Sequence, residues 1–181
     1  MIYTIQNEFL TVRVEDLGAQ LSSIQAPDGT EYLWQGDPDI WARRAPILFP
    51  FIARLRENTY YLDGQPYAIS THGFARDMVF SLADQGEDHI SLQLTDTPET
   101  RKVYPFSFSL TVTYTLEKNL LKKSHRVENR SDKDMYYELG AHDGFRAPVE
   151  PGVPMSSWSI RLPGVEHVQF YGMDESCTLT P

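Results

Sequence analysis

One run of the chain alternates apolar and small polar residues without interruption, from Phe106 to Leu116. The serines and threonines of this run fall on one side of an extended chain, and the apolar residues fall on the other. Only a β-strand, whose side chains alternate with a period of two, separates the residues in this way. The run therefore predicts a long strand with one buried face, formed by Phe106, Phe108, Leu110, Val112, Tyr114 and Leu116.

Shorter copies of this pattern occur elsewhere, separated by turn residues. Asp63-Gly64 joins the apolar segments 60–62 and 67–69, and Asp-Gly is a strong signal for a β-hairpin. No convincing amphipathic helix exceeds about two turns. Further strands are expected around residues 12–14, 79–82 and 90–94, with turns at 28–29 and 84–88.

This organisation predicts an all-β chain, an antiparallel β-sandwich or barrel, that forms a single domain over residues 1–181. With 41% hydrophobic and 23% charged residues, the composition is that of an ordered globular protein. The formal net charge of −9 argues against nucleic acid or an anionic membrane as the partner.

Cysteine usage and hydropathy bear on the compartment. Cys177 is the only cysteine, which excludes an intrachain disulfide and a thiolate metal site, so we expect a reducing, cytoplasmic location. The first residues lack the pattern of a signal peptide, and no apolar run approaches the length of a transmembrane helix.

Several short stretches differ from plain strand. Residues 43–56 combine arginines with apolar residues and proline, and a buried arginine needs an anion or several acceptors. His72 precedes a glycine that permits close approach of a ligand, and small residues surround His142. The alternatives are a surface arginine whose stem covers apolar surface, a turn histidine without a role and a buried core histidine.

Other signals are weak or absent. Trp34 and Trp41 could stack on a sugar, although tryptophan in a β-protein usually belongs to the core. No metal-ligand spacing occurs among the histidines, and we expect neither a metal nor a cofactor. The serine nucleophile elbow and the glycine-rich phosphate loop are also absent, which removes the functions that depend on them.

Taken in chain order, short segments between residue 18 and about residue 148 resemble the aldose 1-epimerase (mutarotase) family, and more closely its LacX-like branch. The resemblance implies a large antiparallel sandwich of the galactose mutarotase type, with a sugar cleft on a concave face. The matching segments are 18–24, 31–37, Trp41, 45–50, 54–55, 61–64, 72–76, 104–108, 127–129 and 139–142.

The resemblance also implies an isomerase that interconverts the α and β anomers of an aldohexose such as galactose or glucose. In this family a glutamate takes the proton of the anomeric hydroxyl, and a histidine gives one to the ring oxygen. His142 matches that histidine acid, His72 matches the second histidine, and Arg54 matches the arginine that binds the sugar. Arg76, beside His72 in the motif, is expected to line the cleft.

The match is incomplete in two respects. The glutamate base of the family lies beyond the matched positions, and none of Glu138, Glu150, Glu166 and Glu175 stands in a matching context. Asp143 also replaces a proline that is usual in relatives. We therefore expect a sandwich that is incomplete at its C-terminus, either as a fragment or completed by a partner chain, as in a homodimer. A sugar-binding module without turnover and a structural or regulatory β-domain remain as alternatives.

Overall fold

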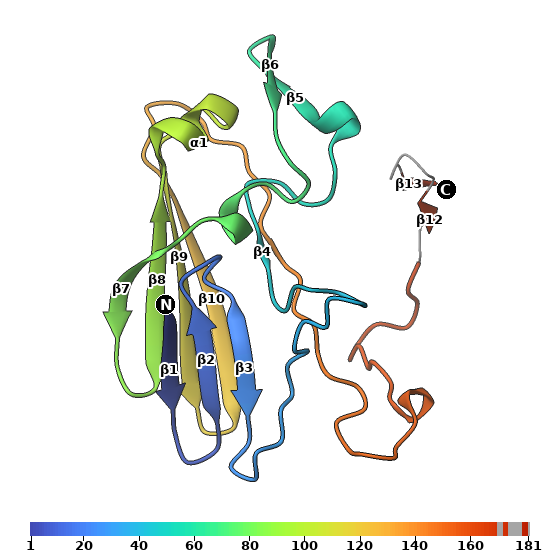
Figure 1. Cartoon of the computed structure of the whole chain (residues 1–181). Helices are drawn as coiled ribbons and strands as arrows, with labels where there is room; N and C mark the ends of the chain where they lie inside the picture. Colours follow the sequence, from blue (N-terminus) through green and yellow to red (C-terminus); the bar gives the residue numbers. More distant parts are fainter. Residues whose placement is uncertain (170–171, 174–178, 181) are drawn as a thin grey trace. The chain divides into compact units, whose positions relative to one another are not determined.

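The computed structural model describes residues 1–169, 172–173 and 179–180 (Figure 1). Cys177 and Glu175 lie outside the described residues. The chain divides into two compact units, residues 1–146 and 147–181. The expectation of a single sandwich domain over residues 1–181 stays a prediction.

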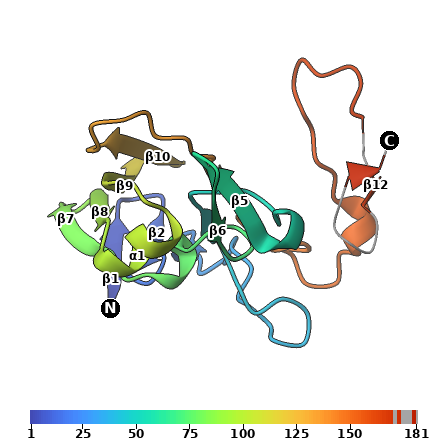
Figure 2. The same cartoon turned by 90° about the horizontal axis from the view of Figure 1, so that it is seen from above.

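The first unit contains two larger antiparallel sheets (Figures 1 and 2). The three-stranded sheet runs in the order β1-β2-β3, with β1 at Ile2–Gln6, β2 at Thr11–Glu15 and β3 at Leu21–Gln25. The four-stranded sheet runs in the order β10-β9-β8-β7, with β7 at Ser81–Gln85, β8 at His89–Thr95, β9 at Phe108–Glu117 and β10 at Leu120–Asn129.

The two sheets share one hydrophobic core. Apolar side chains of β1, β2 and β3 join those of β8 and β9 in a single buried cluster, and burial of such side chains is the main favourable contribution to folding. The Tyr114 hydroxyl crosses between the layers and donates to the Ala19 carbonyl at 2.8 Å. The predicted long strand is confirmed as β9, whose alternate residues Phe108, Leu110, Val112, Tyr114 and Leu116 are all buried.

The neighbouring strand, β10, was not predicted from the sequence. Register places Lys123 opposite Tyr114 and His125 opposite Val112. Cross-strand partners share a face of the sheet, so two basic side chains of β10 point to the side on which β9 is buried. Because a lysine and a histidine stand at these positions, the segment lacks the alternation of apolar residues by which a strand is predicted from sequence.

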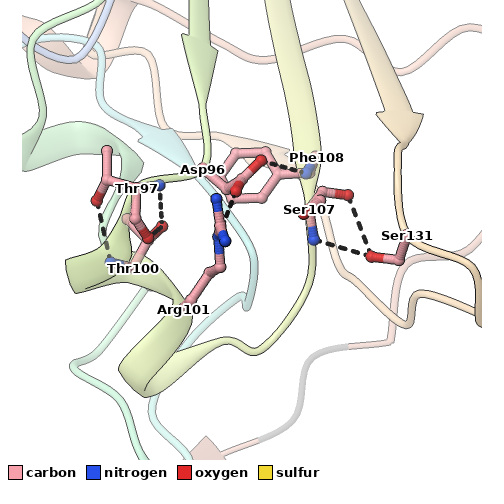
Figure 3. A network of polar contacts seen from close by, with 7 residues as sticks. All are labelled: Asp96, Thr97, Thr100, Arg101, Ser107, Phe108 and Ser131. Carbon is pink, nitrogen blue, oxygen red and sulfur yellow. Dashed lines mark hydrogen bonds and ion pairs between the residues drawn. The ribbon is translucent and has the colours of Figure 1, made fainter.

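One short helix, α1 at Pro98–Val103, connects β8 to β9, in agreement with the expected lack of long helices. Thr97 and Thr100 cap its start, each side chain accepting a hydrogen bond from the backbone amide of the other (Figure 3). Asp96 accepts hydrogen bonds from the Phe108 amide at 3.0 Å and from Nε of Arg101 at 2.6 Å (Figure 3). These contacts join the helix to the first residue of β9.

A hairpin and short bridging strands complete the first unit. Strand β5 at Thr59–Leu62 pairs with β6 at Gln65–Ala68 across Asp63-Gly64, which confirms the predicted hairpin. Both turn residues have positive φ, as a two-residue hairpin turn of this class requires. Strand β4 at Ile47–Leu48 pairs with β11 at Gly140–Ala141.

The second unit contains little regular structure. It has a 3₁₀ turn at Met155–Ser157 and a pair of two-residue strands, β12 at Gly172–Met173 and β13 at Leu179–Thr180. Within the described residues of the whole chain, none of the helices is long and apolar enough to cross a membrane.

Candidate functional site

His142 lies on a segment that is held by its main chain. The segment continues from β11, where the His142 amide donates to the Pro46 carbonyl at 3.0 Å and the Gly144 amide donates to the Arg44 carbonyl at 2.8 Å. On its other side, the Gly144 carbonyl accepts from the Trp34 amide at 2.9 Å. The backbone that carries His142 is therefore fixed by partners from two other parts of the chain.

His72 lies in a tight turn. Its φ is +67° and that of Gly73 is +72°, so both residues adopt the left-handed conformation, which is unusual for histidine. The His72 amide donates to the Ala53 carbonyl at 2.9 Å, and Nδ1 of the His72 ring accepts from the Ala53 amide at 2.9 Å. Because an amide can only donate, Nδ1 carries no proton, and the neutral ring holds its proton on Nε2.

The two histidines meet although 70 positions separate them. Their ring centroids lie 6.3 Å apart, and the ring planes are inclined at 62° to each other. The Trp41 ring packs against His142 at 5.0 Å, and the Trp34 indole donates to the Trp41 carbonyl at 2.7 Å. His142 is thus bordered by Trp41 and by His72.

Arginines surround the His72 turn. Nε of Arg54 donates to the Thr71 hydroxyl at 3.4 Å, and a terminal nitrogen of Arg76 donates to the Thr71 carbonyl at 2.7 Å. Asp77 pairs with Arg76 at 3.5 Å and with Arg43 at 2.9 Å. Arg54 is exposed, whereas the Arg76 side chain is only 16% exposed and is held by its neighbours.

An open hollow of about 540 Å³, lined by both polar and apolar residues, lies beside this turn. Arg54 and Thr71 line it together with Asn58 and Ser70. The guanidinium of Arg54 therefore borders both an open cavity and the residue that precedes His72.

Charge and burial both act on His72. Burial lowers the pKa of His72, and electrostatic interactions with Arg76, His142 and Arg43 act in the same direction. Burial and the nearby Arg43 also lower the pKa of Arg76, although Asp77 opposes this effect. His72 is thus favoured as a neutral ring that donates through Nε2, and the arginines make its surroundings positive within an acidic chain.

The structure brings the four expected site residues together around Thr71 and His72. Two other histidines of the first unit lie elsewhere: His89 contacts Asp84 and Asp88 at the β7–β8 hairpin, and His125 lies on β10. Among the residues described, no group of three or more His, Cys, Asp and Glu side chains is arranged to hold a metal ion.

The family model for aldose 1-epimerases matches residues 1–169. The chain belongs to the aldose 1-epimerase family. Two LacX proteins of Lactococcus lactis subsp. lactis, one chromosomal and one plasmid-borne, are each 36% identical to it over 172 residues. The match covers 92% of this chain and 58% of each LacX protein.

Solved structures agree with this family assignment. A galactose mutarotase related enzyme from Lactobacillus acidophilus is 40% identical, with a TM-score of 0.83 over 85% of this chain and 52% of its own. A galactose mutarotase-like protein from Lactobacillus casei is 36% identical, with a TM-score of 0.78 over 80% of this chain and 50% of its own. The expected fold, an antiparallel sandwich of the galactose mutarotase type, is therefore confirmed. The chain spans little more than half the length of the curated relatives that it matches.

Several contacts of the site could not be found from the sequence. Thr71 joins Arg54 to Arg76, Asp77 joins Arg76 to Arg43, and the Ala53 amide fixes the His72 ring. The only signal for Thr71 and Asp77 was their closeness in the chain to His72 and Arg76. Ala53 could not be recognised from the sequence, because it contributes a backbone amide, and every residue except proline has one.

Proposed function

We propose that this chain carries the histidine- and arginine-bearing part of a sugar site that interconverts the α and β anomers of an aldohexose such as galactose or glucose. The observation that carries the proposal is the meeting of His72 and His142, with ring centroids 6.3 Å apart, in a member of the aldose 1-epimerase family. A pyranose that contacts both rings would have its ring oxygen and anomeric hydroxyl within reach of imidazole nitrogens.

His142 is the proposed general acid. Protonated His142 gives its proton to the ring oxygen as the bond between that oxygen and C1 breaks, which yields the open-chain aldehyde. Rotation about C1–C2 and closure on the other face of the carbonyl give the other anomer, and His142 recovers its proton. Proton transfer of this kind by a positioned side chain contributes roughly 10²–10⁴ in rate.

His72 and Arg54 are proposed to bind the sugar. The Ala53 amide occupies Nδ1 of His72, which leaves Nε2–H as a hydrogen-bond donor toward a sugar oxygen. Arg54 lines the hollow beside the turn, and its guanidinium offers several hydrogen-bond donors, so it suits a binding role. Arg76 is also proposed to border the sugar, although its contacts with Thr71 and Asp77 suit a supporting role better.

The reaction also needs an acceptor for the proton of the anomeric hydroxyl. The family resemblance assigns this role to a glutamate for which no residue of this chain has been matched. This supports a second candidate, in which the site binds a hexose without turnover. A completing chain, or another carboxylate supplied by a second copy in a homodimer, is proposed as a source of the missing group.

Polarimetry of freshly dissolved α-D-galactose and α-D-glucose tests the proposal. We expect the chain to accelerate the change in optical rotation over buffer, and His142→Ala to abolish the acceleration. His167→Ala is the matched control, because His167 is an exposed histidine without an assigned role. Equal rates for wild type, His142→Ala and buffer would contradict the catalytic proposal.

Calorimetric titration with the same hexoses separates the two candidates. Saturable binding that is weakened by His72→Ala, without acceleration of mutarotation, would favour the binding module. If no common hexose gives heat and no rate is accelerated, both candidates fail.

A further inference from the structure

Asp143, the residue after His142, forms an ion pair within the first unit. Its carboxylate lies 2.8 Å from Nζ of Lys123 on β10, and the two side chains are only 22% and 11% exposed, respectively. Among the residues that the structure describes, no other acidic side chain pairs with Lys123. An ion pair withdrawn from water in this way is costly to break on one side, because the remaining charge loses its partner.

The pair lies on the opposite side of the segment from the candidate site. Asp143 and Lys123 line a cavity of about 450 Å³ together with Leu21 of β3 and Leu121 of β10. His142 instead contacts Trp41 and His72. Neighbouring residues of an extended chain point to opposite sides, so an anchor at position 143 restrains the residue at 142 without touching the sugar side.

Gly144, the residue after Asp143, is closely packed, so a small movement of residues 142–144 would disturb its contacts. A Cβ atom at Gly144 would lie 2.8 Å from the Trp41 ring and 3.0 Å from Cβ of Trp34. The Trp41 ring that packs on His142 therefore also lies directly over the backbone of residue 144. A shift of the segment would change the contact between Trp41 and His142 as well as the backbone hydrogen bonds.

Other charged or polar groups near the pair offer no substitute for Asp143. Nζ of Lys123 lies 5.9 Å from the centre of the Tyr114 ring, and the Tyr114 hydroxyl is engaged by the Ala19 carbonyl. Nε2 of His125 is buried without a hydrogen-bond partner in the described part of the chain. Burial and the charge of Lys123 lower the pKa of His125, although the charge of Asp143 opposes this effect, and the net lowering favours the neutral form of His125.

We propose that Asp143, held by Lys123, is a positioning residue that fixes the His142 segment against β10 and thereby orients the His142 imidazole. The inference rests on the proposed function in one respect, namely that His142 acts on a sugar. The anchoring itself does not depend on any substrate.

Amide hydrogen exchange tests the anchoring in the whole chain. Asp143→Asn keeps the shape of the side chain and removes its charge. We expect exchange at the His142 and Gly144 amides to accelerate about tenfold, and the Phe80 amide, which donates to the Asp16 carbonyl, to change less than about twofold. Asp143→Glu keeps the charge and should retain most of the protection.

The matched control is Glu117→Gln, which breaks the exposed ion pair between Glu117 and Lys122 of β10. It should leave all these amides unchanged. If Asp143→Asn does not fold, Lys123→Met removes the cation while keeping the apolar stem, and it should give the same local acceleration. Unchanged exchange at residues 142 and 144, or a rise that merely parallels Phe80, would overturn the inference.

A second readout concerns the imidazole itself. The ¹⁵N signals of the His142 ring should move in Asp143→Asn and return in Asp143→Glu, whereas Glu117→Gln should leave them in place. If the wild-type chain accelerates mutarotation, Asp143→Asn should lower kcat about tenfold and change KM less than about twofold. A wild-type chain without mutarotation contradicts the proposed function, and the exchange and ring signals still decide the anchoring.

Discussion

The carbonyl oxygen of Phe49 would lie well inside the van der Waals contact distance of a Cβ atom placed at Gly73, which is a severe steric overlap. The same oxygen accepts hydrogen bonds from the Phe74 amide at 3.0 Å and the Ala75 amide at 3.2 Å. Gly73 therefore holds the turn that carries His72 against the segment before Pro50. Because the φ of Gly73 is also positive, two independent constraints exclude a side chain at this position.

Gly73→Ala should consequently destabilise the chain strongly. Overlap with backbone atoms cannot be relieved by a rotamer change, and the left-handed conformation adds its own penalty, so we expect a loss of about 3 kcal/mol or more in the free energy of unfolding. Gly64→Ala is the matched control, because Gly64 has a φ of +76° and open space around it. Chemical denaturation should show a loss of about 1 kcal/mol for the control, and equal losses for the two variants would contradict the steric explanation.

The pKa of His72 should lie below its ordinary value of 6.5. Burial and the neighbouring positive charges disfavour the protonated ring, and protonation of Nδ1 would also remove the acceptor of the Ala53 amide. An NMR titration of the imidazole signals measures this pKa directly. His167, an exposed histidine, serves as the internal reference in the same spectra.

Because folding lowers the pKa of His72, the stability of the chain should depend on pH. The unfolded chain binds a proton at His72 near pH 6.5, above the pH at which the folded chain binds it, so stability should fall as the pH decreases below about 6.5. His72→Gln should flatten this part of the stability curve, because glutamine does not titrate. An identical curve for wild type and His72→Gln between pH 7 and pH 5 would show that another group causes the loss.

The fold could be predicted where buried and exposed side chains alternate along a strand with a period of two. Strand β9 and the β5–β6 hairpin carried clear signals, an unbroken alternation and an Asp-Gly turn. Strand β10 did not, because Lys123 and His125 stand where apolar residues would reveal a buried face. The placement of Lys123 is compensated by Asp143, a partner 20 residues away that no local sequence pattern contains.

The sequence indicated which residues to consider for the candidate site but did not indicate their geometry. Family resemblance selected His72, His142, Arg54 and Arg76 by their motifs. The tautomer of His72, in contrast, depends on a backbone amide of Ala53, and backbone donors are the same in every residue except proline. The sharing of Thr71 by two arginines likewise depends on how the turn folds.

Glu31 should prove structural although it belongs to a matching motif. Its buried carboxylate accepts from the Ser23 hydroxyl at 2.6 Å, the Ile24 amide at 2.8 Å and the Leu33 amide at 2.9 Å. Glu31→Ala leaves three donors without an acceptor and should lower the free energy of unfolding by about 2–4 kcal/mol. Glu8→Ala, at an exposed glutamate, should change it by less than about 0.5 kcal/mol. A denaturation midpoint unchanged by Glu31→Ala would mean that water replaces the carboxylate without loss.

Trp41 should contribute to sugar binding through its indole ring. The ring packs at 5.0 Å against His142, and the indole of Trp34 fixes its backbone by donating to the Trp41 carbonyl. An aromatic face beside the proposed acid can cover the apolar C–H surface of a pyranose, so Trp41→Ala should weaken hexose binding about tenfold and Trp41→Phe should weaken it less. Trp158→Phe, at an exposed tryptophan of the second unit, is the control. Calorimetric titration with galactose measures the affinities. If Trp41→Ala binds as tightly as wild type while Trp158→Phe does not, the sugar contacts the second unit instead of the face beside His142.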